Sequence, residues 1–403
     1  MDHSLRTGSM QGSYFWIEEV IYYKRIDLSI RSSNQQTKGE KEMKKSLLYV
    51  LSLLAVVAVV LTSCSAAPAA PATEAPAAAP KFTCALITPN PLGDRSFIDA
   101  SARGIKKANE ELPVKCDIIE TNGVSEHETA LRGAIAQKYD LVLGLAMDTD
   151  MFVGLAKEFP DQKFASPSEI FLDELPPNMV AYQIDVHESS FLVGVIVGSL
   201  TKTKTVGAVV GGDAPGLNQF FYGYKQGVLE VCPDCKVLVS YLGFDFSNPT
   251  LGLETALGQY DEGDDIIYQV AGRSGEGVLE AAAQRDLYAI GVDSNQDDIQ
   301  PGHVIVSSLK KVEATTYDPI KLVVDGKFAG GFQRRGLKEG FAGLSWDEGS
   351  TTFETKGPAD MTAKIPEIKK LVEEWRTKIL SGEYKVCDAF AADTPECVAV
   401  IAK

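Results

Sequence analysis

The chain has 403 residues, of which 45% are hydrophobic and 23% are charged. This is the composition of a soluble globular protein that is long enough for two domain cores, and it excludes disorder for most of the chain. The formal net charge of -16 repels phosphate backbones, and no stripe of Lys and Arg with interleaved aromatics offsets it, so we expect no nucleic-acid partner.

Residues 43–63 have the pattern of a secretory signal peptide. Two lysines follow Met43, then comes an apolar stretch too short for a comfortable membrane span, and then the small residues of "LTSC". This end resembles the bacterial lipobox, in which the cysteine, here Cys64, is lipidated and becomes the mature N-terminus. An uncleaved signal anchor is the alternative. Residues 1–42 precede a complete signal, and we expect them to be a mis-assigned upstream segment.

Residues 64–81 form a low-complexity tract rich in Ala and Pro. Such a composition cannot build a packed core, and it favours an extended, semi-stiff chain. We therefore expect a tether that holds a folded domain away from a membrane.

From Phe82 onward, short β-rich runs alternate with amphipathic helices. The expected strands are 82–88, 114–120, 139–146, 162–168 and 179–185, followed by 205–212, 236–243, 265–272, 287–293 and 304–310. This alternation predicts parallel sheets with helices on both faces, and the length favours two lobes with a ligand cleft between them. The apolar segment 188–200 is too short to span a membrane and opens with Glu188, so we expect a buried helix. Residues 365–384 predict a surface-docked C-terminal helix.

Six cysteines remain in the predicted exported domain, a compartment that permits disulfides. Six cysteines allow 15 pairings, and we expect three local bridges. The expected bridges pair Cys84 with Cys116, Cys232 with Cys235, and Cys387 with Cys397. The "CPDC" segment could also be a redox motif or half a zinc site. It lies in a helix-to-strand connection without a second ligand pair nearby, so a structural bridge is the favoured interpretation.

Catalytic signatures are missing from the sequence. No nucleophile elbow, zinc-binding helix or phosphate-binding Gly-rich motif is present, and we expect no catalytic residue, metal or cofactor. The histidines are scattered, and each is expected in a loop or at the surface. They are His3, His127, His187 and His303.

Three groups of residues are candidates for ligand binding. The loop that contains Gly272 can offer backbone N–H groups at a helix N-terminus, although a simple tight turn explains its glycines equally well. Asp293 and Lys310 end successive strands and together suit a vicinal diol such as a ribose, with an ordinary surface ion pair as the alternative. Phe97 and Phe246 lie in polar loops and could sandwich a flat ligand, with core packing as the alternative for each ring.

Several segments, by their order and spacing, resemble the basic membrane protein family, the purine nucleoside receptor A-like substrate-binding lipoproteins of ABC transporters. They include "GDRSFIDASARGIKKA", "NMVAYQIDVHESSFLVGVIVGSL", "AGRSGEGV", "IGVDSNQ" and "SSLKKVE". The resemblance implies an α/β type I periplasmic-binding-protein fold, with two Rossmann-like lobes that close on a ligand about a hinge of three crossing segments. It implies one lobe of residues 82–185 plus about 310–345, and another of residues 186–309 plus about 346–403.

The same resemblance implies roles for individual residues. Phe97 and Phe246 would stack the base, Asp293 and Lys310 would bind the ribose hydroxyls, and Gly272 would line the cleft. Asp94 and Ser96 belong to the loop that clamps the ligand.

Three sites depart from the family pattern, and they carry Asn90 (after Pro89), Ile98 and Ser168 in place of other family residues. Fewer polar ligand contacts predict a shifted specificity.

The resulting prediction is a monomeric, membrane-anchored extracytoplasmic lipoprotein that binds a nucleoside and delivers it to an ABC permease. Two other functions are alternatives. One is a ligand sensor that docks to a membrane receptor. The other is an exported nucleoside hydrolase that would use cleft carboxylates such as Asp94 and Asp293.

Overall fold

The computed structural model describes residues 82–402, except positions 169, 171 and 173. The described residues all belong to one compact unit of the chain. The predicted upstream segment, the signal peptide, the lipidation site Cys64 and the Ala/Pro tether lie outside the described residues, as does His3.

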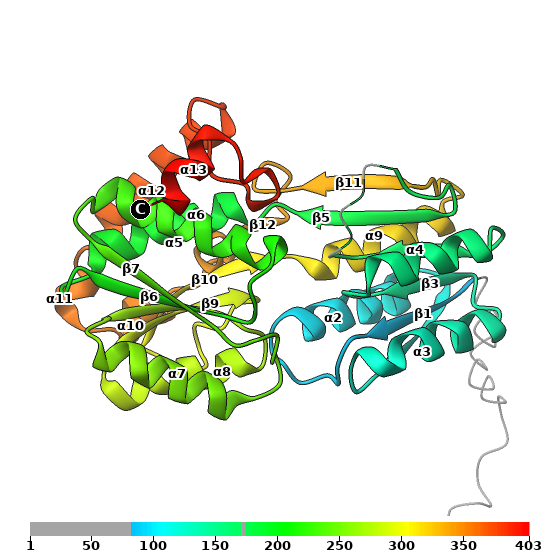
Figure 1. Ribbon diagram of the computed structural model, residues 1–403, viewed down its shortest axis with the longest axis horizontal. Helices are drawn as coiled ribbons and strands as arrows, with labels where there is room; N and C mark the ends of the chain where they lie inside the picture. Colours follow the sequence, from blue (N-terminus) through cyan, green and yellow to red (C-terminus); the bar gives the residue numbers. More distant parts are fainter. Residues whose placement is uncertain (1–81, 169, 171, 173, 403) are drawn as a thin grey trace, which may run out of the picture. The chain divides into compact units, whose positions relative to one another are not determined.

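The first sheet has six parallel strands in the order β11-β5-β4-β3-β1-β2 (Figure 1). Its strands are β1 Phe82–Thr88, β2 Val114–Glu120, β3 Leu141–Gly144, β4 Lys163–Ser166, β5 Met179–Ile184 and β11 Gly331–Arg335. Its helices are α2 Phe97–Glu111, α3 Val124–Ala136, α4 Thr149–Glu158 and α9 Val312–Val324. Helices α3 and α4 share one apolar cluster with the sheet, while α2 and α9 pack together in another. We refer to this sheet and its helices as the first lobe.

The second sheet has the order β12-β10-β9-β8-β6-β7, and only the short β12 runs antiparallel to its neighbour among the strands described. Its strands are β6 Thr205–Val210, β7 Lys236–Tyr241, β8 Ile266–Val270, β9 Tyr288–Asp293, β10 Val304–Lys310 and β12 Ala342–Leu344. Helices α5 His187–Leu200 and α6 Pro215–Val231 cover one face, and α7 Pro249–Asp261 and α8 Ser274–Arg285 cover the other (Figure 1). This sheet and its helices form the second lobe.

The C-terminal part of the chain adds short helices to the second lobe. These elements are η1 Ser345–Glu348, α10 Thr352–Lys356, α11 Ala359–Thr362, α12 Ile365–Leu380, η2 Ala389–Ala391 and α13 Pro395–Ile401. Helix α12 contacts α5, as expected for a docked surface helix, and only four of its residues are buried.

The predicted α/β class with two mostly parallel sheets is confirmed. Central strands such as β3 and β5 are buried along their whole length, because helices cover both faces of each sheet. Two strands were not predicted. β11 has the sequence "GFQRR", is half-exposed, and lies at a sheet edge, while β12 has only three residues. Neither gives the apolar run that marks a buried parallel strand.

Three short segments connect the lobes. The chain crosses between β5 and α5, between β10 and α9, and between β11 and β12. The last crossing ends where β12 begins at Ala342. This is a few residues before position 345, the approximate end of the first lobe expected from the sequence. Because β12 pairs with β10, this return to the second sheet is fixed by backbone hydrogen bonding.

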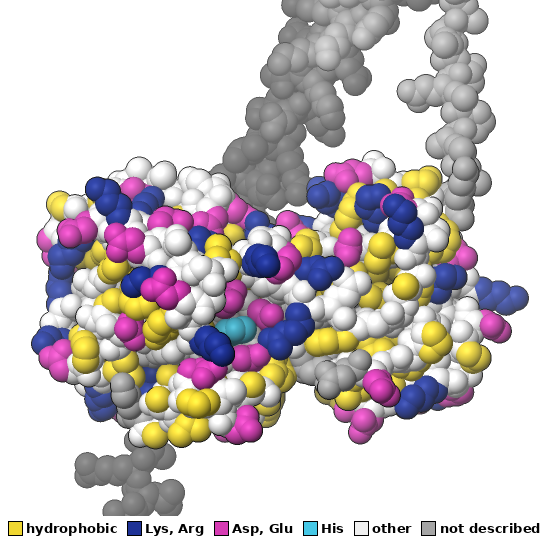
Figure 2. All heavy atoms as spheres, turned by 90° about the horizontal axis from the view of Figure 1, so that it is seen from above, with side chains coloured by type: hydrophobic (Ala, Val, Ile, Leu, Met, Phe, Trp, Pro, Cys, Tyr) yellow, Lys and Arg dark blue, Asp and Glu magenta, His cyan; other side chains and the backbone are white. Residues whose placement is uncertain are grey.

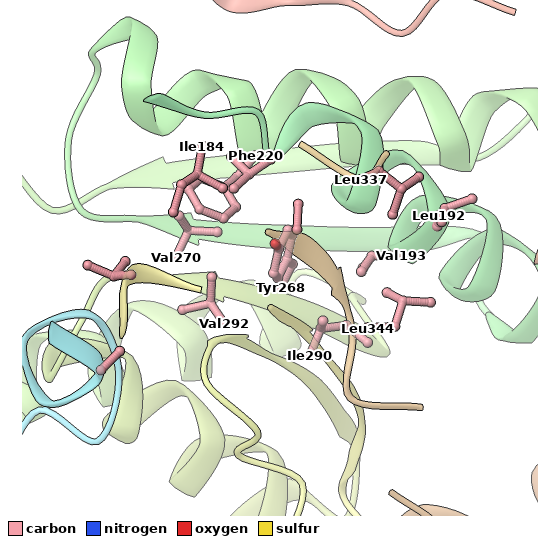
Figure 3. Packing of buried hydrophobic residues seen from close by; sticks show 14 of the residues in the cluster. Ile184, Leu192, Val193, Phe220, Tyr268, Val270, Ile290, Val292, Leu337 and Leu344 are labelled. Carbon is pink, nitrogen blue, oxygen red and sulfur yellow. The ribbon is translucent and has the colours of Figure 1, made fainter. Parts of the chain in front are cut away.

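Helix α5 is a buried helix, as its apolar sequence and its short length predicted. It packs against α6 with the two backbones in close contact, since a Cβ on Gly194 would lie 2.1 Å from the carbonyl oxygen of Tyr224. A Cβ on Gly227 would lie 2.0 Å from the carbonyl oxygen of Phe191. Figure 3 shows Val193 and Phe220 in one apolar cluster with residues of the sheet, and the ring of Phe220 is 6.4 Å from that of Tyr268 on β8. Within the described range, no helix is long and apolar enough to cross a membrane.

Three disulfides close local loops. They join Cys84 to Cys116, Cys232 to Cys235, and Cys387 to Cys397, which are the pairs that the sequence analysis expected. The first bridge links directly paired residues of β1 and β2, and "CPDC" lies between α6 and β7. The segment between Cys387 and Cys397 is not only a loop, because it contains η2 and the start of α13.

Candidate functional site

The carboxyl ends of the parallel strands in both lobes carry the candidate site. The loop after β1 leads into α2, and Asp94 in this loop is only 4% exposed. Its carboxylate accepts backbone N–H groups of Ser96 at 3.0 Å, Ile98 at 2.8 Å and Asp99 at 3.0 Å. Asp94 therefore caps the start of α2. Burial raises the pKa of Asp94, although these three hydrogen bonds oppose the increase.

Ser96 and Asp293 connect the two lobes. The Ser96 hydroxyl donates to Oδ2 of Asp293 at 2.5 Å, and Ser96 is fully buried. Next to this pair, the Gln296 side chain donates to the carbonyl oxygen of Arg95 at 3.3 Å, and Arg103 donates to the Ser294 hydroxyl at 2.8 Å. Asp293 thus lies at a junction where side chains from α2 and its preceding loop meet the end of β9.

The backbone is strained at the same strand ends. Asp293 has a φ of 63°, Arg95 of 51°, Ala146 of 50° and Phe244 of 68°. A non-glycine residue in the left-handed region costs on the order of 1 kcal/mol, and such strain clusters at binding sites because the surrounding structure maintains it. Asp293, Ala146 and Phe244 lie at, or within three residues of, the carboxyl end of a strand, and Arg95 lies in the loop before α2. Three further residues with positive φ precede strands at the opposite edge of the sheets, namely Lys138, Lys204 and Asp286.

Lys310 lies beside two aromatic rings. Its Nζ is 4.9 Å from the ring centre of Phe97 and 5.8 Å from that of Phe220. Both distances are within the range of cation–π attraction. The Lys310 side chain is 5% exposed, so this attraction acts in a poorly solvated environment. Sequence analysis missed Phe220, because an apolar residue on the buried face of α6 gives no signal that separates a site residue from a core residue.

Phe246 and Gly272 form a second aromatic group at the end of the second sheet. The ring of Phe246 lies over Gly211, where a Cβ would be only 2.1 Å from a ring carbon. Gly272 has a φ of 55°, which favours glycine, and a Cβ there would lie 3.5 Å from the carbonyl oxygen of Phe246. The same carbonyl accepts the backbone N–H of Ser274 at 3.2 Å. The position of the Phe246 ring therefore depends on Gly211.

A cavity of about 420 Å³ lies where the two lobes meet. Asp293 and Lys310 line it, together with Arg95, Asp99 and Arg103 from the first lobe. Charges of both signs therefore surround the cavity, a setting for a polar ligand. The other predicted ligand residues are not among the described residues that line it. They are Asp94, Ser96, Phe97, Phe246 and Gly272.

The structure shows the surroundings of Ile98, Asn90 and Ser168, the three residues expected to shift the specificity. Ile98 is 6% exposed and belongs to the large apolar cluster beneath α2. The carbonyl oxygen of Asn90 accepts the Thr88 hydroxyl at 2.9 Å. Ser168 is 1% exposed, and its carbonyl oxygen accepts the Ser166 hydroxyl at 3.0 Å.

The histidine prediction was wrong for two residues. His127 on α3 and His187 on α5 are buried, with exposures of 3% and 8%. His127 lies 3.2 Å from the carbonyl oxygen of Pro89, and His187 lies 3.3 Å from Oε1 of Gln219. These hydrogen bonds reduce the free-energy cost of burying a polar ring. They join residues that are distant along the chain, so a single sequence does not reveal them. No cluster of His, Cys, Asp and Glu suited to a metal ion occurs in the part of the chain that the structure describes.

The two lobes, the three crossings and the facing strand ends define the type I periplasmic-binding fold. A solved ABC transporter solute-binding protein from Aeropyrum pernix is similar, with a TM-score of 0.68 and 29% identity over 76% of this chain and 93% of that chain. A further solute-binding protein, from Conexibacter woesei, has a TM-score of 0.58 at 23% identity, covers 76% of this chain and 99% of its own, and supports the fold alone.

Residues 81–379 match the model of the Bmp family, described as ABC transporter substrate-binding protein PnrA-like, and the chain belongs to this family. The family consists of substrate-binding proteins, not of enzymes. Basic membrane protein D of Borreliella burgdorferi is 32% identical over 66% of this chain and 79% of its own length. The ABC transporter nucleoside-binding protein BmpA of Lactococcus lactis is 28% identical over 74% of this chain and 86% of its own. An uncharacterised lipoprotein of Pyrococcus abyssi is 29% identical over 72% of this chain and 75% of its own length.

Proposed function

We propose that this protein is the extracytoplasmic binding component of an ABC importer, that it takes up a nucleoside in the interlobe cleft, and that it passes the nucleoside to a permease. The observation that carries the proposal is the pair Asp293 and Lys310, which line one polar cavity within a fold of the substrate-binding family. The nucleoside-binding relative from Lactococcus lactis supports the choice of ligand class.

The proposed ligand contacts follow from the chemistry of the site. Asp293 already accepts a hydroxyl group, that of Ser96, and ribose hydroxyls would donate to the same carboxylate. Lys310 lines the same cavity, and its ammonium would donate to the ribose hydroxyl oxygens. Phe97 and Phe246 lie outside this cavity in the present structure, and on closure of the lobes around the ligand they would stack the base, with each stack contributing roughly 1–3 kcal/mol. The loop at Gly272 would complete the wall next to Phe246.

The hydrolase alternative is not supported by the geometry of Asp94. Three backbone N–H groups occupy its carboxylate, so that it is committed to capping α2 and is poorly placed to transfer a proton. We therefore propose that the protein binds its ligand without catalysing a reaction. We also propose that it acts as a monomer. The alternative is docking to a membrane receptor. In that case the protein would bind its ligand, but reconstitution with the proposed permease would give no ligand uptake.

The proposed location is the outer face of a cell membrane. Lipidation of Cys64 would anchor the chain, and the Ala/Pro tract of residues 64–81 would space the folded unit from the bilayer. Relatives named as lipoproteins support this part of the proposal.

The test is a thermal-shift screen of residues 78–403 against purine and pyrimidine nucleosides, free bases, ribose and common sugars. A ligand that binds only the folded state, at 100 times its Kd, adds about 2.7 kcal/mol to the free energy of unfolding. We expect stabilisation by one nucleoside class, loss of that shift in Asp293→Ala, and a weaker shift in Phe246→Ala. Leu380→Ala, which shortens an exposed apolar side chain at the end of α12, is the control.

Stabilisation by a solute that is not a nucleoside, with no shift from any nucleoside, would contradict the proposed ligand. It would leave membership of the substrate-binding family intact.

A further inference from the structure

The chain continues beyond the region that matches the family. The match ends at residue 379, whereas an ordered C-terminal segment, residues 385–402, follows helix α12. We call it the C-terminal segment. It contains η2 and α13, and both contact α6 of the second lobe. A disulfide between Cys387 and Cys397 closes it, and both cysteines are fully buried.

Hydrogen bonds attach the C-terminal segment to the second lobe. The backbone N–H of Cys387 donates to the Gln226 side chain on α6 at 2.7 Å. The Gln226 amide in turn donates to the carbonyl oxygen of Lys385 at 3.2 Å. Val400 and the two cysteines form a small apolar cluster on Tyr222 of the same helix. The segment is therefore a fixed part of the second lobe.

One side chain of the segment reaches the first lobe. Asp388 accepts a hydrogen bond from Nη2 of Arg334 at 2.7 Å. Arg334 lies on β11, the edge strand of the first sheet, and its guanidinium also donates to Asp185 through Nη2 at 2.7 Å and Nε at 3.1 Å. Asp185 directly follows β5. Arg334 and Asp185 thus lie where two of the three crossings leave the first lobe.

We propose that the C-terminal segment is a strap across the hinge, which restrains the opening of the two lobes through the Asp388–Arg334 ion pair. The inference rests on the proposed function only in assuming that the lobes open and close. Opening requires backbone rotation in the crossings after β5 and β11, and the strap holds the residues from which both crossings start.

The carboxylates of this cluster are more shielded than its guanidinium. The Asp388 and Asp185 side chains are only 16% and 17% exposed, whereas the Arg334 side chain is 45% exposed, so water and salt still screen the pair in part. Burial by itself opposes ionisation of Asp388, but the hydrogen bond from Arg334 and the charge of His187 outweigh it, and the pKa of Asp388 is lowered. Figure 2 shows basic and acidic side chains gathered around a histidine in a hollow of the face seen from above.

The experiment measures lobe separation without any ligand. Spin labels are placed by Val124→Cys on α3 of the first lobe and by Thr250→Cys on α7 of the second, two exposed sites, in residues 78–403 with the native disulfides intact. The distribution of label-to-label distances then reports the ratio of open to closed molecules. In Asp388→Asn we expect this ratio to increase by about twofold to fivefold, the range for loss of one partly exposed ion pair.

Two further variants and one control complete the test. Arg334→Gln removes the other partner and should give the same change, and joint replacement of Cys387 and Cys397 by serine should increase the ratio by loosening the segment. Glu158→Gln is the matched control, because it breaks an Arg–carboxylate pair of 2.8 to 2.9 Å within the first lobe. It should leave the distances unchanged.

Unchanged distance distributions in folded Asp388→Asn and Arg334→Gln would overturn the strap. An equal change in the Glu158→Gln control would do so too. Neither result depends on which solute the protein binds, so the failure of the strap is distinguishable from a failure of the nucleoside proposal.

Discussion

Replacement of Asp264 by Asn is expected to stabilise the protein at neutral and alkaline pH. Asp264 lies between α7 and β8 and is 1% exposed, and both of its carboxylate oxygens are without a hydrogen-bond partner in the described structure. Oε1 of Gln259 is also unpaired. The two groups are neighbours, since a Cβ on Gly207 would lie 2.3 Å from Gln259 Oε1 and 2.4 Å from Asp264 Oδ2. A proton on Asp264 would allow the carboxyl group to donate to Gln259 Oε1, which would pair two of the three unpaired oxygens.

The magnitude follows from proton linkage. Burial, helped by the charges of Glu262 and Asp265, raises the pKa of Asp264 from 3.8 to about 7. The folded state then binds more protons than the unfolded state between these two values, so the free energy of unfolding falls as the pH rises through this interval. At about 1.4 kcal/mol per pH unit, the loss is on the order of 4 kcal/mol, and it is complete above pH 7.

An asparagine has the same shape, can donate its amide to Gln259, and does not ionise. Asp264→Asn should therefore match the wild type near pH 4 and exceed it by several kcal/mol at pH 8, as measured by denaturant unfolding at both pH values. The exposed substitution Asp161→Asn is the control. An equal difference between Asp264→Asn and the wild type at pH 4 and pH 8 would refute the reasoning, because it would mean that Asp264 does not change protonation on folding.

Three further predictions concern the site and the anchor. Asp94→Ala should lower the free energy of unfolding by about 1–3 kcal/mol in a thermal melt, because three backbone N–H groups lose their acceptor, whereas an equally stable variant would contradict the capping role. Gly211→Ala should displace the Phe246 ring and weaken ligand binding measured by calorimetry, whereas Gly154→Ala, which has open space around it, should not. Cys64→Ser should release the chain from the membrane fraction in cell fractionation, and retention there would contradict lipid anchoring.

Much of the secondary structure could be predicted because buried parallel strands have a strong signal. The run "FTCALIT" predicts β1 with its observed bounds, since helices on both faces of the sheet require continuous apolar residues. The edge strand β11 is partly exposed and does not need a continuous apolar run. Its two arginines therefore gave no signal of a strand in the sequence. Arg334 in that strand is the residue on which the proposed strap depends.

The candidate site was predictable only in part. Asp293 and Lys310 end adjacent strands, so the order of the sheet brings them together, and both line the same cavity. The partners from the other lobe were not predictable in this way. Ser96 lies 197 positions from Asp293 in the chain, and Phe220 has the ordinary pattern of a core residue on a helix.

The sequence by itself determined the alternation of strands and helices, the class of fold and the strand ends at which polar residues gather, because these depend on local apolar periodicity and on turn chemistry. Only the tertiary structure decided that Ser96 reaches Asp293 and that Asp388 binds Arg334. These contacts depend on how two lobes and a C-terminal segment pack, and the energy of such packing is shared among residues that are distant along the chain.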